Sequence, residues 1–495
     1  MAIKSALGKQ LGTQFDSVFD VVKSNPIYDK SGGKIPSLDL NFAKSKSLKD
    51  SRSTENNITF SRASSGTFVG SDGLIKTTTV NLLIHSEQFD NTAWTKSNGT
   101  TVNLNAVAAP DGTNTGSIVN FPGSSSRFFQ TKTLTAGTYT LSAFLRVSSG
   151  SKALTMQVFN STDGSQNKNI TVTDSWQRFT HTVTVSGAAS QLHPVRPDDL
   201  GDVYVWGAQL EEGTTVTDYI PTTNTISGAP RFDHDPVTRE SLGLLMEESR
   251  TNEISTDIGL TSNVTGVSLS EDSSVSKPDG TTGALKITAT AGSSVHSAQR
   301  TSGSTTTNHT FSVFVKKGNH RYIGLSQGGT SNNIHVIFDT DTKTITDDGA
   351  HNSGTFVSSG FEEYANGWFR IHMVGFTQGT NLRVFLAEDA SQNGLKNWSA
   401  TGDEFCYAWG LQREDGTFPT SYIPTSGSSV TRAADIAEIT GADFAKTNLL
   451  QYSERLDDAT WVKERTTITP NTISAPDGTN TADLIVEDTG TGTHS

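Results

Sequence analysis

The feature that most constrains the fold of this chain is a segment that occurs twice. Residues 203–222 read Val-Tyr-Val-Trp-Gly-Ala-Gln-Leu-Glu-Glu-Gly-Thr-Thr-Val-Thr-Asp-Tyr-Ile-Pro-Thr, and residues 407–425 read Tyr-Ala-Trp-Gly-Leu-Gln-Arg-Glu-Asp-Gly-Thr-Phe-Pro-Thr-Ser-Tyr-Ile-Pro-Thr. In each copy the Pro follows the Trp by 15 residues. Because this spacing is kept while the residues between them differ, the segment predicts a repeated structural unit.

Each copy predicts the closing strand of a β-domain. In residues 203–208, Val, Val and Gly alternate with Tyr, Trp and Ala, which is typical of a strand with both faces partly covered. Glu-Glu-Gly and Glu-Asp-Gly predict a turn, and the Pro of Tyr-Ile-Pro ends the unit because it cannot donate to a further ladder. Trp206 and Trp409 have two interpretations, a stacking platform for a sugar ring or a core side chain. Their apolar strand neighbours favour the core.

The composition is that of a chain with many short strands and polar turns. Only 33% of the 495 residues are hydrophobic, 45 are Gly, and Ser, Thr and Asn are abundant. This mixture favours strands over helices, and the length predicts about three domains. The net charge of −13 and the pI near 5.3 argue against nucleic acid or an anionic membrane as a partner, because either would require a basic patch.

Cysteine usage and hydropathy exclude further classes. Cys406 is the only cysteine, so the chain forms no internal disulfide and no cysteine-based metal site, and its apolar strand predicts a small buried side chain. No apolar run reaches transmembrane length. Residues 1–30 lack the apolar core and cleavage site of a signal peptide.

The N-terminal region, residues 1–30, is predicted to be an amphipathic helix. Its apolar residues recur at three- and four-residue steps, from Ile3 through Leu7 and Leu11 to Val22. The apolar stripe has two interpretations: it packs on the first domain of the chain, or it docks the chain to a larger assembly or to its own copies.

Residues 31–80 are predicted to form a connector of one strand and one hairpin. Residues 38–42 alternate as Leu-Asp-Leu-Asn-Phe, which predicts a strand, and Ser-Asp-Gly at 71–73 between apolar stretches predicts a hairpin. The sequence Thr-Phe-Ser-Arg-Ala at 59–63 has a relative in Ser-Val-Thr-Arg-Ala at 429–433. The connectors therefore repeat together with the larger units.

The larger units predict tandem antiparallel β-sandwiches of the jelly-roll, lectin-like type. Residues 138–146 match 308–316 as alternating strands, and each unit holds eight or more such strands separated by turns. We expect sandwiches over 81–225 and 252–430, a spacer hairpin over 226–251, a linker over 431–447, and an incomplete third unit over 448–495.

Several polar motifs have both a structural and a metal-binding interpretation. Pro-Asp-Gly-Thr recurs around Asp111, Asp279 and Asp477; Pro and Gly favour a turn, with calcium binding as the weaker alternative. His234 stands between two Asp residues, but adjacent strand residues point to opposite faces, so a solvated turn is favoured over a metal site. The Asp-rich loop after Phe338 resembles a calcium loop but contains Lys343, which favours a hairpin turn.

The sequence holds no catalytic constellation, which predicts a non-enzymatic protein without a cofactor. The adjacent pairs at Glu211–Glu212 and Glu247–Glu248 have diverging side chains, unlike the facing carboxylates of glycosidases. We assign no catalytic and no metal-binding residues from the sequence, and the ligand-binding residues stay unassigned.

The motifs together resemble a known group of proteins. Asn-Leu-Leu-Ile-His-Ser-Glu-Gln-Phe at 81–89, Ala-Pro-Asp-Gly-Thr, Trp-Gly-Ala-Gln-Leu-Glu-Glu-Gly, Tyr-Ile-Pro-Thr and Arg-Phe-Asp-His-Asp-Pro at 231–236 are similar to the repeated modules of virion proteins of tailed phages. The likeness is strongest to fibres and appendages of marine phages that infect cyanobacteria, and it spans about residues 38–495. The resemblance implies carbohydrate-binding-like β-sandwiches and a trimer.

The leading hypothesis is a tail or capsid fibre of a tailed phage. It would be anchored to other virion proteins by its N-terminus, assembled in the host cytoplasm, and would present its modules to host surface glycans. The first alternative is a secreted bacterial adhesin or an accessory carbohydrate-binding protein. The second is the non-catalytic part of a polysaccharide depolymerase.

Overall fold

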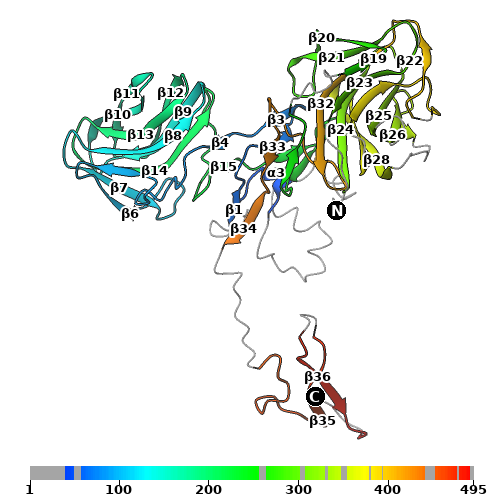
Figure 1. Ribbon diagram of the computed structural model, residues 1–495. Coiled ribbons are helices and arrows are strands. Elements are labelled where there is room, and N and C mark those ends of the chain that lie inside the picture. Colours follow the sequence, from blue (N-terminus) through cyan, green and yellow to red (C-terminus); the bar gives the residue numbers. More distant parts are fainter. Residues whose placement is uncertain are drawn as a thin grey trace, which may run out of the picture. The chain divides into compact units, whose positions relative to one another are not determined.

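A computed structural model describes residues 40–49, 57–255, 263–301, 307–328, 333–346, 354–377, 381–392, 394–440, 452–475 and 479–490. The predicted N-terminal helix and the first two residues of the predicted strand at 38–42 lie outside these residues. The chain divides into two compact bodies, the larger ending at Glu438 and the smaller made of Ser53–Asn57 and Ile439–Ser495. The predicted fold class is confirmed, because antiparallel sheets make up almost all of the regular structure (Figure 1).

Module 1, the sandwich of strands β5 to β14, consists of two five-stranded sheets. Its first sheet has the order β11-β10-β13-β8-β5 (Gly164–Thr173, Ser151–Asn160, Ala188–Pro197, Arg127–Leu134, Thr95–Ser97). Its second sheet has the order β12-β9-β14-β7-β6 (Gln177–Val185, Gly137–Arg146, Gly201–Glu212, Gly116–Phe121, Thr101–Val107). Side chains such as Leu141, Val158 and Val205 fill the space between the sheets.

Module 2, the sandwich of strands β19 to β32, has two six-stranded sheets. The first has the order β19-β23-β30-β25-β26-β27 (Asn263–Thr265, His296–Thr301, Asn381–Leu386, Tyr322–Gly328, Asn333–Asp339, Thr344–Thr346). The second has the order β20-β21-β32-β24-β29-β28 (Val267–Ser276, Thr282–Ala289, Phe405–Asp415, His309–Lys317, Trp368–Phe376, Thr355–Tyr364). The short pair β22 (Gly292–Ser294) and β31 (Trp398–Ala400) and the 3₁₀ turn η1 (Ala365–Gly367) complete it.

The two modules share one strand order once β27 and β28 of module 2 are set aside. In both, the strand that carries the repeated Trp, β14 or β32, is the third strand of the second sheet and pairs with β9 or β24. The cores match as well, since Leu141 and Phe311 hold corresponding buried positions. The matching registers allow residues of module 1 to be paired with residues of module 2 by position.

A connector of short strands from three chain segments accompanies the modules. Its pairs are β2–β3, β4–β15, β16–β17, β18–β33 and β1–β34 (Thr67–Val69, Ile75–Thr77, Val80–Asn81, Ser227–Gly228, Phe232–His234, Ser241–Leu244, Arg250–Asn252, Val430–Arg432, Asn57–Ser61, Ile436–Thr440). The hairpin predicted at Ser-Asp-Gly is confirmed as β2–β3, with Gly73 at φ 79°.

The prediction of a strand through Phe42 is wrong for its described end. Helix α3 (Phe42–Ser45) begins there, because the Asn41 side chain accepts a hydrogen bond from the Lys44 backbone N–H and so caps the helix. Alternation over five residues is too short to outweigh such a cap.

A buried ion cluster holds the connector together and explains its repeated Arg-Ala sequence. Asp435 contacts both Arg62, at 2.8 Å, and Arg231, while Glu247 contacts Arg231 at 2.6 Å and Arg432 at 3.1 Å. The three arginines are at most 1% exposed. Burial lowers the pKa of Arg62 and Arg432, and the carboxylates oppose this effect.

The repeated closing segment owes its fixed spacing to a return of the chain over the Trp. The Trp206 ring packs at a tilt against Tyr219, with 4.6 Å between ring centroids, and Trp409 packs in the same way against Tyr422 at 4.7 Å. Gln209 Oε1 accepts from the Ile220 N–H at 2.7 Å, which ties the strand to the returning segment. Both Trp side chains are 5% exposed, so they are buried as predicted, but against the outer face of the second sheet rather than between the sheets.

The predicted alternation is interrupted at Gly207 by a bulge. The register between β14 and β9 shifts between Trp206 and Gln209, and Gly207 takes φ 61°. Gly410 takes φ 62° at the corresponding shift in module 2. A bulge of this kind needs a residue without a Cβ, which accounts for the Trp-Gly dipeptide in both copies.

The smaller body contains one antiparallel hairpin, β35 (Thr466–Ile473) with β36 (Ala482–Glu487). The Pro-Asp-Gly turn at 476–478 lies outside the described residues. Among the described residues, no helix is long and apolar enough to cross a membrane.

Candidate functional site

A row of polar and aromatic side chains crosses the outer face of the first sheet of module 1. The cross-strand pairs Asn167–Gln157 and Gln157–His193 place these residues side by side, and the His193 ring lies 4.7 Å from the ring of Phe129. Their chain neighbours Met156, Leu192 and Phe128 point the other way, into the core. We call this row, together with Thr155, Asn169, Arg127, Arg196 and Phe159, the polar face.

Hydrogen bonds within the polar face hold its amides in place. Gln157 Nε2 donates to Asn167 Oδ1 at 2.6 Å, and Thr155 Oγ1 donates to Asp198 Oδ2 at 2.7 Å. Gln157 Oε1 and Asn167 Nδ2 make no further hydrogen bond within the described part of the chain. The face therefore offers an oriented acceptor beside an oriented donor.

Two arginines add positive charge to this face of an acidic protein. Arg127 Nη1 donates to the carbonyls of Ser124 and Ser126 at 2.9 and 2.8 Å, which positions its guanidinium. Burial and the charge of Arg127 lower the pKa of Arg196. The Arg196 Nε is buried and makes no hydrogen bond to any described residue.

His193 is kept neutral. Its side chain is 1% exposed, and burial together with the charges of Arg196 and Arg127 lowers its pKa to about 3. A neutral imidazole has one N–H donor and one lone-pair acceptor. At neutral pH, His193 therefore adds no charge to the polar face.

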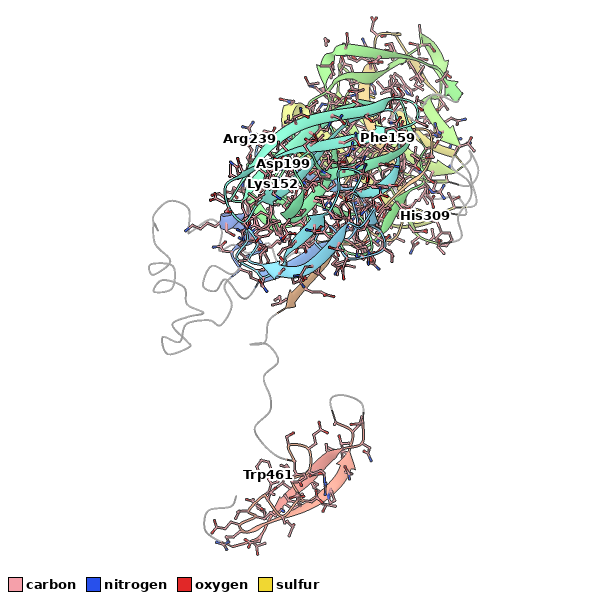
Figure 2. All side chains as sticks on the ribbon, turned by 90° about the vertical axis from the view of Figure 1, so that its left-hand side faces the viewer. Lys152, Phe159, Asp199, Arg239, His309 and Trp461 are labelled. Atoms are coloured by element: carbon pink, nitrogen blue, oxygen red, sulfur yellow. The ribbon has the colours of Figure 1, made fainter. Side chains whose placement is uncertain are left out.

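Two phenyl rings border the polar groups. Phe129 is half-buried beside His193, and Phe159 is 36% exposed. Phe159 lies near one end of β10 and Lys152 near the other (Figure 2). Flat apolar rings next to amide donors and acceptors suit a ligand that has both C–H faces and hydroxyl groups.

The corresponding face of module 2 is closed by apolar side chains. Tyr322, Ile337, Phe385, Ala387 and Leu395 form a second apolar cluster outside the main core. Leu395 packs against this face, and the Gly394 N–H donates to His335 Nε2 at 2.9 Å. Ser326, Asn333 and His335 are at most 4% exposed.

The strand registers show which residues close this face of module 2. Gly324 pairs with Phe385 and with Ile337, so these three residues take the positions of Gln157, His193 and Asn167. A Cβ at position 324 would lie 2.1 Å from the Phe385 ring, so a side chain at this position would displace the phenyl ring.

The residues singled out in the sequence lie elsewhere and have structural roles. Asp111 Oδ1 accepts from the Thr113 N–H and hydroxyl, and Asp279 does the same with Thr281, as expected of turns. The pairs Glu211–Glu212 and Glu247–Glu248 diverge: Glu211 is buried and Glu247 is partly buried, whereas Glu212 and Glu248 are exposed. Cys406 is buried in the core, which raises its pKa to about 12.

The prediction of a solvated turn at His234 is wrong. His234 is 4% exposed, and its Nδ1 hydrogen-bonds the Val69 carbonyl at 3.0 Å, while Asp233 Oδ1 accepts from the Val69 N–H at 2.7 Å. Asp233 and His234 therefore both hydrogen-bond the backbone of Val69 in β2. The loop after Phe338 is a hairpin turn, as predicted, with Lys343 at φ 53°.

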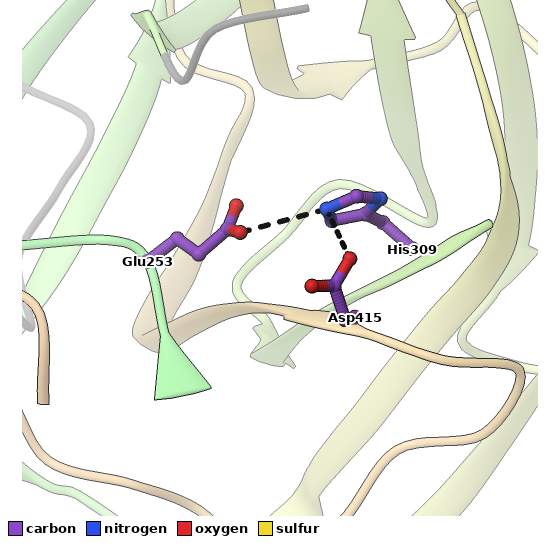
Figure 3. A group of neighbouring side chains, drawn as sticks. All are labelled: Glu253, His309 and Asp415. Atoms are coloured by element: carbon purple, nitrogen blue, oxygen red, sulfur yellow. Dashed lines mark ion pairs between the residues drawn. The ribbon is translucent and has the colours of Figure 1, made fainter. Parts of the chain in front are cut away.

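The sequence reasoning missed the polar face and a second group, Glu253, His309 and Asp415. In this group His309 Nε2 lies 2.8 Å from Asp415 Oδ1 and 3.5 Å from Glu253 Oε1 (Figure 3). The only sequence signal for the polar face is a polar residue between apolar ones along β10, which many exposed strands share. For the second group there is no signal, because its members are far apart in the chain.

No protein-family model matches this chain, and no curated protein matches it. Among solved structures, it is similar to the N-terminal CBM22-1–CBM22-2 tandem domain from Paenibacillus barcinonensis Xyn10C, at 12% identity and a TM-score of 0.24, covering 68% of this chain and 98% of that one. The enzymatically active domain of tailspike protein 4 of bacteriophage CBA120 is similar at 14% identity and a TM-score of 0.22, covering 27% and 21%. Such scores carry no argument about ligands.

Proposed function

We propose that this chain is a non-enzymatic glycan-binding protein and that the polar face of module 1 is its binding site. The observation that carries the proposal is the aligned row of Asn167, Gln157, His193 and Phe129 across four strands. A sugar presents hydroxyl groups at its edge and C–H groups on its faces. The amides match the first, and the phenyl ring matches the second.

The arginines support an extended strand of sugar residues as the ligand. Arg127 and Arg196 flank His193, and each can donate several hydrogen bonds to hydroxyl or carboxylate oxygens. A sheet face with contacts spread over several strands suits a polymer better than a small molecule, which proteins usually enclose in a concave pocket.

Binding of the full chain to host-surface and bacterial polysaccharides on a glycan array tests this proposal. We expect Gln157→Ala and Phe129→Ala each to weaken binding by about 10-fold to 100-fold, the loss of one or two well-placed contacts. Gln177→Ala, an exposed residue of β12 on the other sheet, is the matched control and should bind as the parent does. Unchanged binding by both polar-face variants would overturn the proposal.

We further propose that the protein is a virion appendage of a tailed phage. Its location on the particle tests this proposal. The support is the resemblance of its repeated motifs to phage fibre modules, together with a glycan-binding surface suited to host attachment. Antibody labelling of purified particles should mark an appendage, and sedimentation of the intact chain should give a trimer. A monomer absent from particles would favour the secreted adhesin instead.

The depolymerase alternative makes a different prediction. If the chain were the non-catalytic part of such an enzyme, a longer form carrying it would release reducing ends from the bound polysaccharide. The non-enzymatic proposal requires that the polysaccharide recognised by the polar face stays intact after incubation with that longer form.

A further inference from the structure

We infer that Glu253, His309 and Asp415 of module 2 form a binding site for a divalent transition-metal ion of the Zn²⁺ type. The three residues come from different parts of the chain: Glu253 follows β18, His309 begins β24, and Asp415 ends β32. One ligand atom from each residue lies within 4.8 Å of the others. One imidazole and two carboxylates are ligands that such ions use.

The hydrogen bonds of His309 show that a positive charge belongs at the centre of the group. His309 Nδ1 lies 3.0 Å from the carbonyl oxygen of Thr307, which can only accept, so Nδ1 carries the hydrogen. In the neutral ring Nε2 then has a lone pair, and this lone pair faces the carboxylate oxygens of Glu253 and Asp415. Three lone-pair donors converge, an arrangement that requires a cation between them, either a proton or a metal ion.

The spacing suits a metal ion with one open position. Ligand atoms about 2 Å from a tetrahedral Zn²⁺ lie roughly 3.3 Å apart. The 3.5 Å and 2.8 Å separations from His309 Nε2 are close to this value. Asp415 is 72% exposed and Glu253 is 34% exposed, so an ion can enter from solvent and keep a water ligand.

Neighbouring groups orient the ligands as outer partners of metal sites do. The Thr307 carbonyl fixes the tautomer and the tilt of the His309 ring. Arg413 Nε lies 3.0 Å from Glu253 Oε2, which leaves Glu253 Oε1 toward His309. Glu253, Asp415, Arg413 and the neutral His309 ring together carry one net negative charge before the ion binds.

The site is particular to module 2. The backbone N–H of Glu253 donates to the Arg413 carbonyl, as that of Leu82 donates to Leu210 in module 1. His309 pairs with Asp415 as Tyr139 pairs with Glu212. Module 1 therefore has Leu82, Tyr139 and Glu212 at these positions, a set without an imidazole.

The test uses the full chain, freed of metal by a chelator and then titrated with Zn²⁺ by calorimetry and with Co²⁺ by visible absorption. We expect one equivalent of tight binding and the intense absorption of four-coordinate Co²⁺. Asp415→Asn and His309→Gln should each weaken binding by about 100-fold, since loss of an outer partner alone costs 10-fold to 100-fold. Glu212→Gln, at the position of Asp415 in module 1, is the matched control and should not alter binding.

Folding of the variants is checked by their unfolding temperatures. Asp415 is mostly exposed, so Asp415→Asn should melt as the parent does in the absence of metal, and its loss of binding then reports the site itself. Equal Zn²⁺ affinity in the parent and Asp415→Asn, or no tight binding by the parent, would show that the cation is only a proton. Binding of Ca²⁺ in preference to Zn²⁺ would also overturn the inference.

Discussion

The two sandwiches have the same strand order, but the outer face of the first sheet is polar in module 1 and apolar in module 2. In module 1 that face carries Gln157, His193 and Asn167, whereas in module 2 the same positions hold Gly324, Phe385 and Ile337. Three substitutions thus convert a hydrogen-bonding surface into a site for a second apolar cluster. The comparison teaches that a repeat can keep its strand order while the outer face of one sheet changes from polar to apolar, because the core between the two sheets stays the same.

The largest effect is expected from removing Phe385. Phe385→Ala should destabilise module 2 by about 3–5 kcal/mol, because the phenyl ring is 1% exposed and its loss leaves a cavity. Phe129→Ala in module 1 should cost far less, since that ring is only half-buried. Hydrogen exchange followed by mass spectrometry assigns the destabilisation to β25, β26 and β30.

The two variants should behave oppositely in glycan binding. Phe385→Ala should bind as the parent does at a temperature where module 2 stays folded, and Phe129→Ala should not. If both variants lost binding, the closed face of module 2 would be part of the site and the contrast between the modules would be false.

A smaller effect concerns pH. The pKa of His193 is lowered to about 3, so between about pH 3 and the ordinary pKa near 6.5 the unfolded chain holds a proton that the folded chain does not. Stability is therefore lost as the pH falls through this window, by about 1–2 kcal/mol at pH 4.5 after allowance for relaxation. His193→Gln should make the free energy of unfolding, measured with a denaturant, fall less steeply as the pH is lowered.

His372 of module 2 provides the internal comparison. Burial and the charge of Arg370 lower its pKa to about 4, so it contributes a similar decline. His372→Gln should reduce the loss of stability at low pH in module 2, and His193→Gln should reduce it in module 1. Amide hydrogen-exchange rates of the strands of each module measure the two effects separately. A pH profile unchanged by either substitution would contradict the assignment of neutral histidines.

The smallest expected effect is the same in both modules. Asp111→Ala and Asp279→Ala should each cost about 0.5–1 kcal/mol, because each carboxylate accepts two hydrogen bonds from the Thr two residues later in an exposed turn. Thermal unfolding with and without Ca²⁺ measures this. A much larger cost that appears only with Ca²⁺ would restore the calcium interpretation of these turns.

Local rules account for the parts of the fold that the sequence predicted correctly. The hairpin at Gly73, the turns at Asp111 and Asp279 and the strands β9 and β24 follow from turn chemistry and alternation within a few residues. The errors arose where distant segments meet. His234 was assigned to solvent because its partner, Val69, lies 165 residues earlier in the chain.

The candidate sites show the same division. Gln157 is a buried polar residue of β10, and nothing near it in the sequence indicates that Asn167, His193 and Phe129 lie beside it. Glu253, His309 and Asp415 are likewise unremarkable alone. Each property needed for function is a relation between strands, and a single sequence does not specify pairing registers.

By itself, the sequence determined the repeated architecture, the all-β class and the closing segment, in which Trp206, Gly207 and Tyr219 act within one stretch of chain. Only the tertiary structure decided which sheet face is open, which is closed by Phe385, and where His309 meets two carboxylates. The physical reason is that alternation specifies two faces for every strand. Which of them becomes a surface depends on what the rest of the chain packs against it.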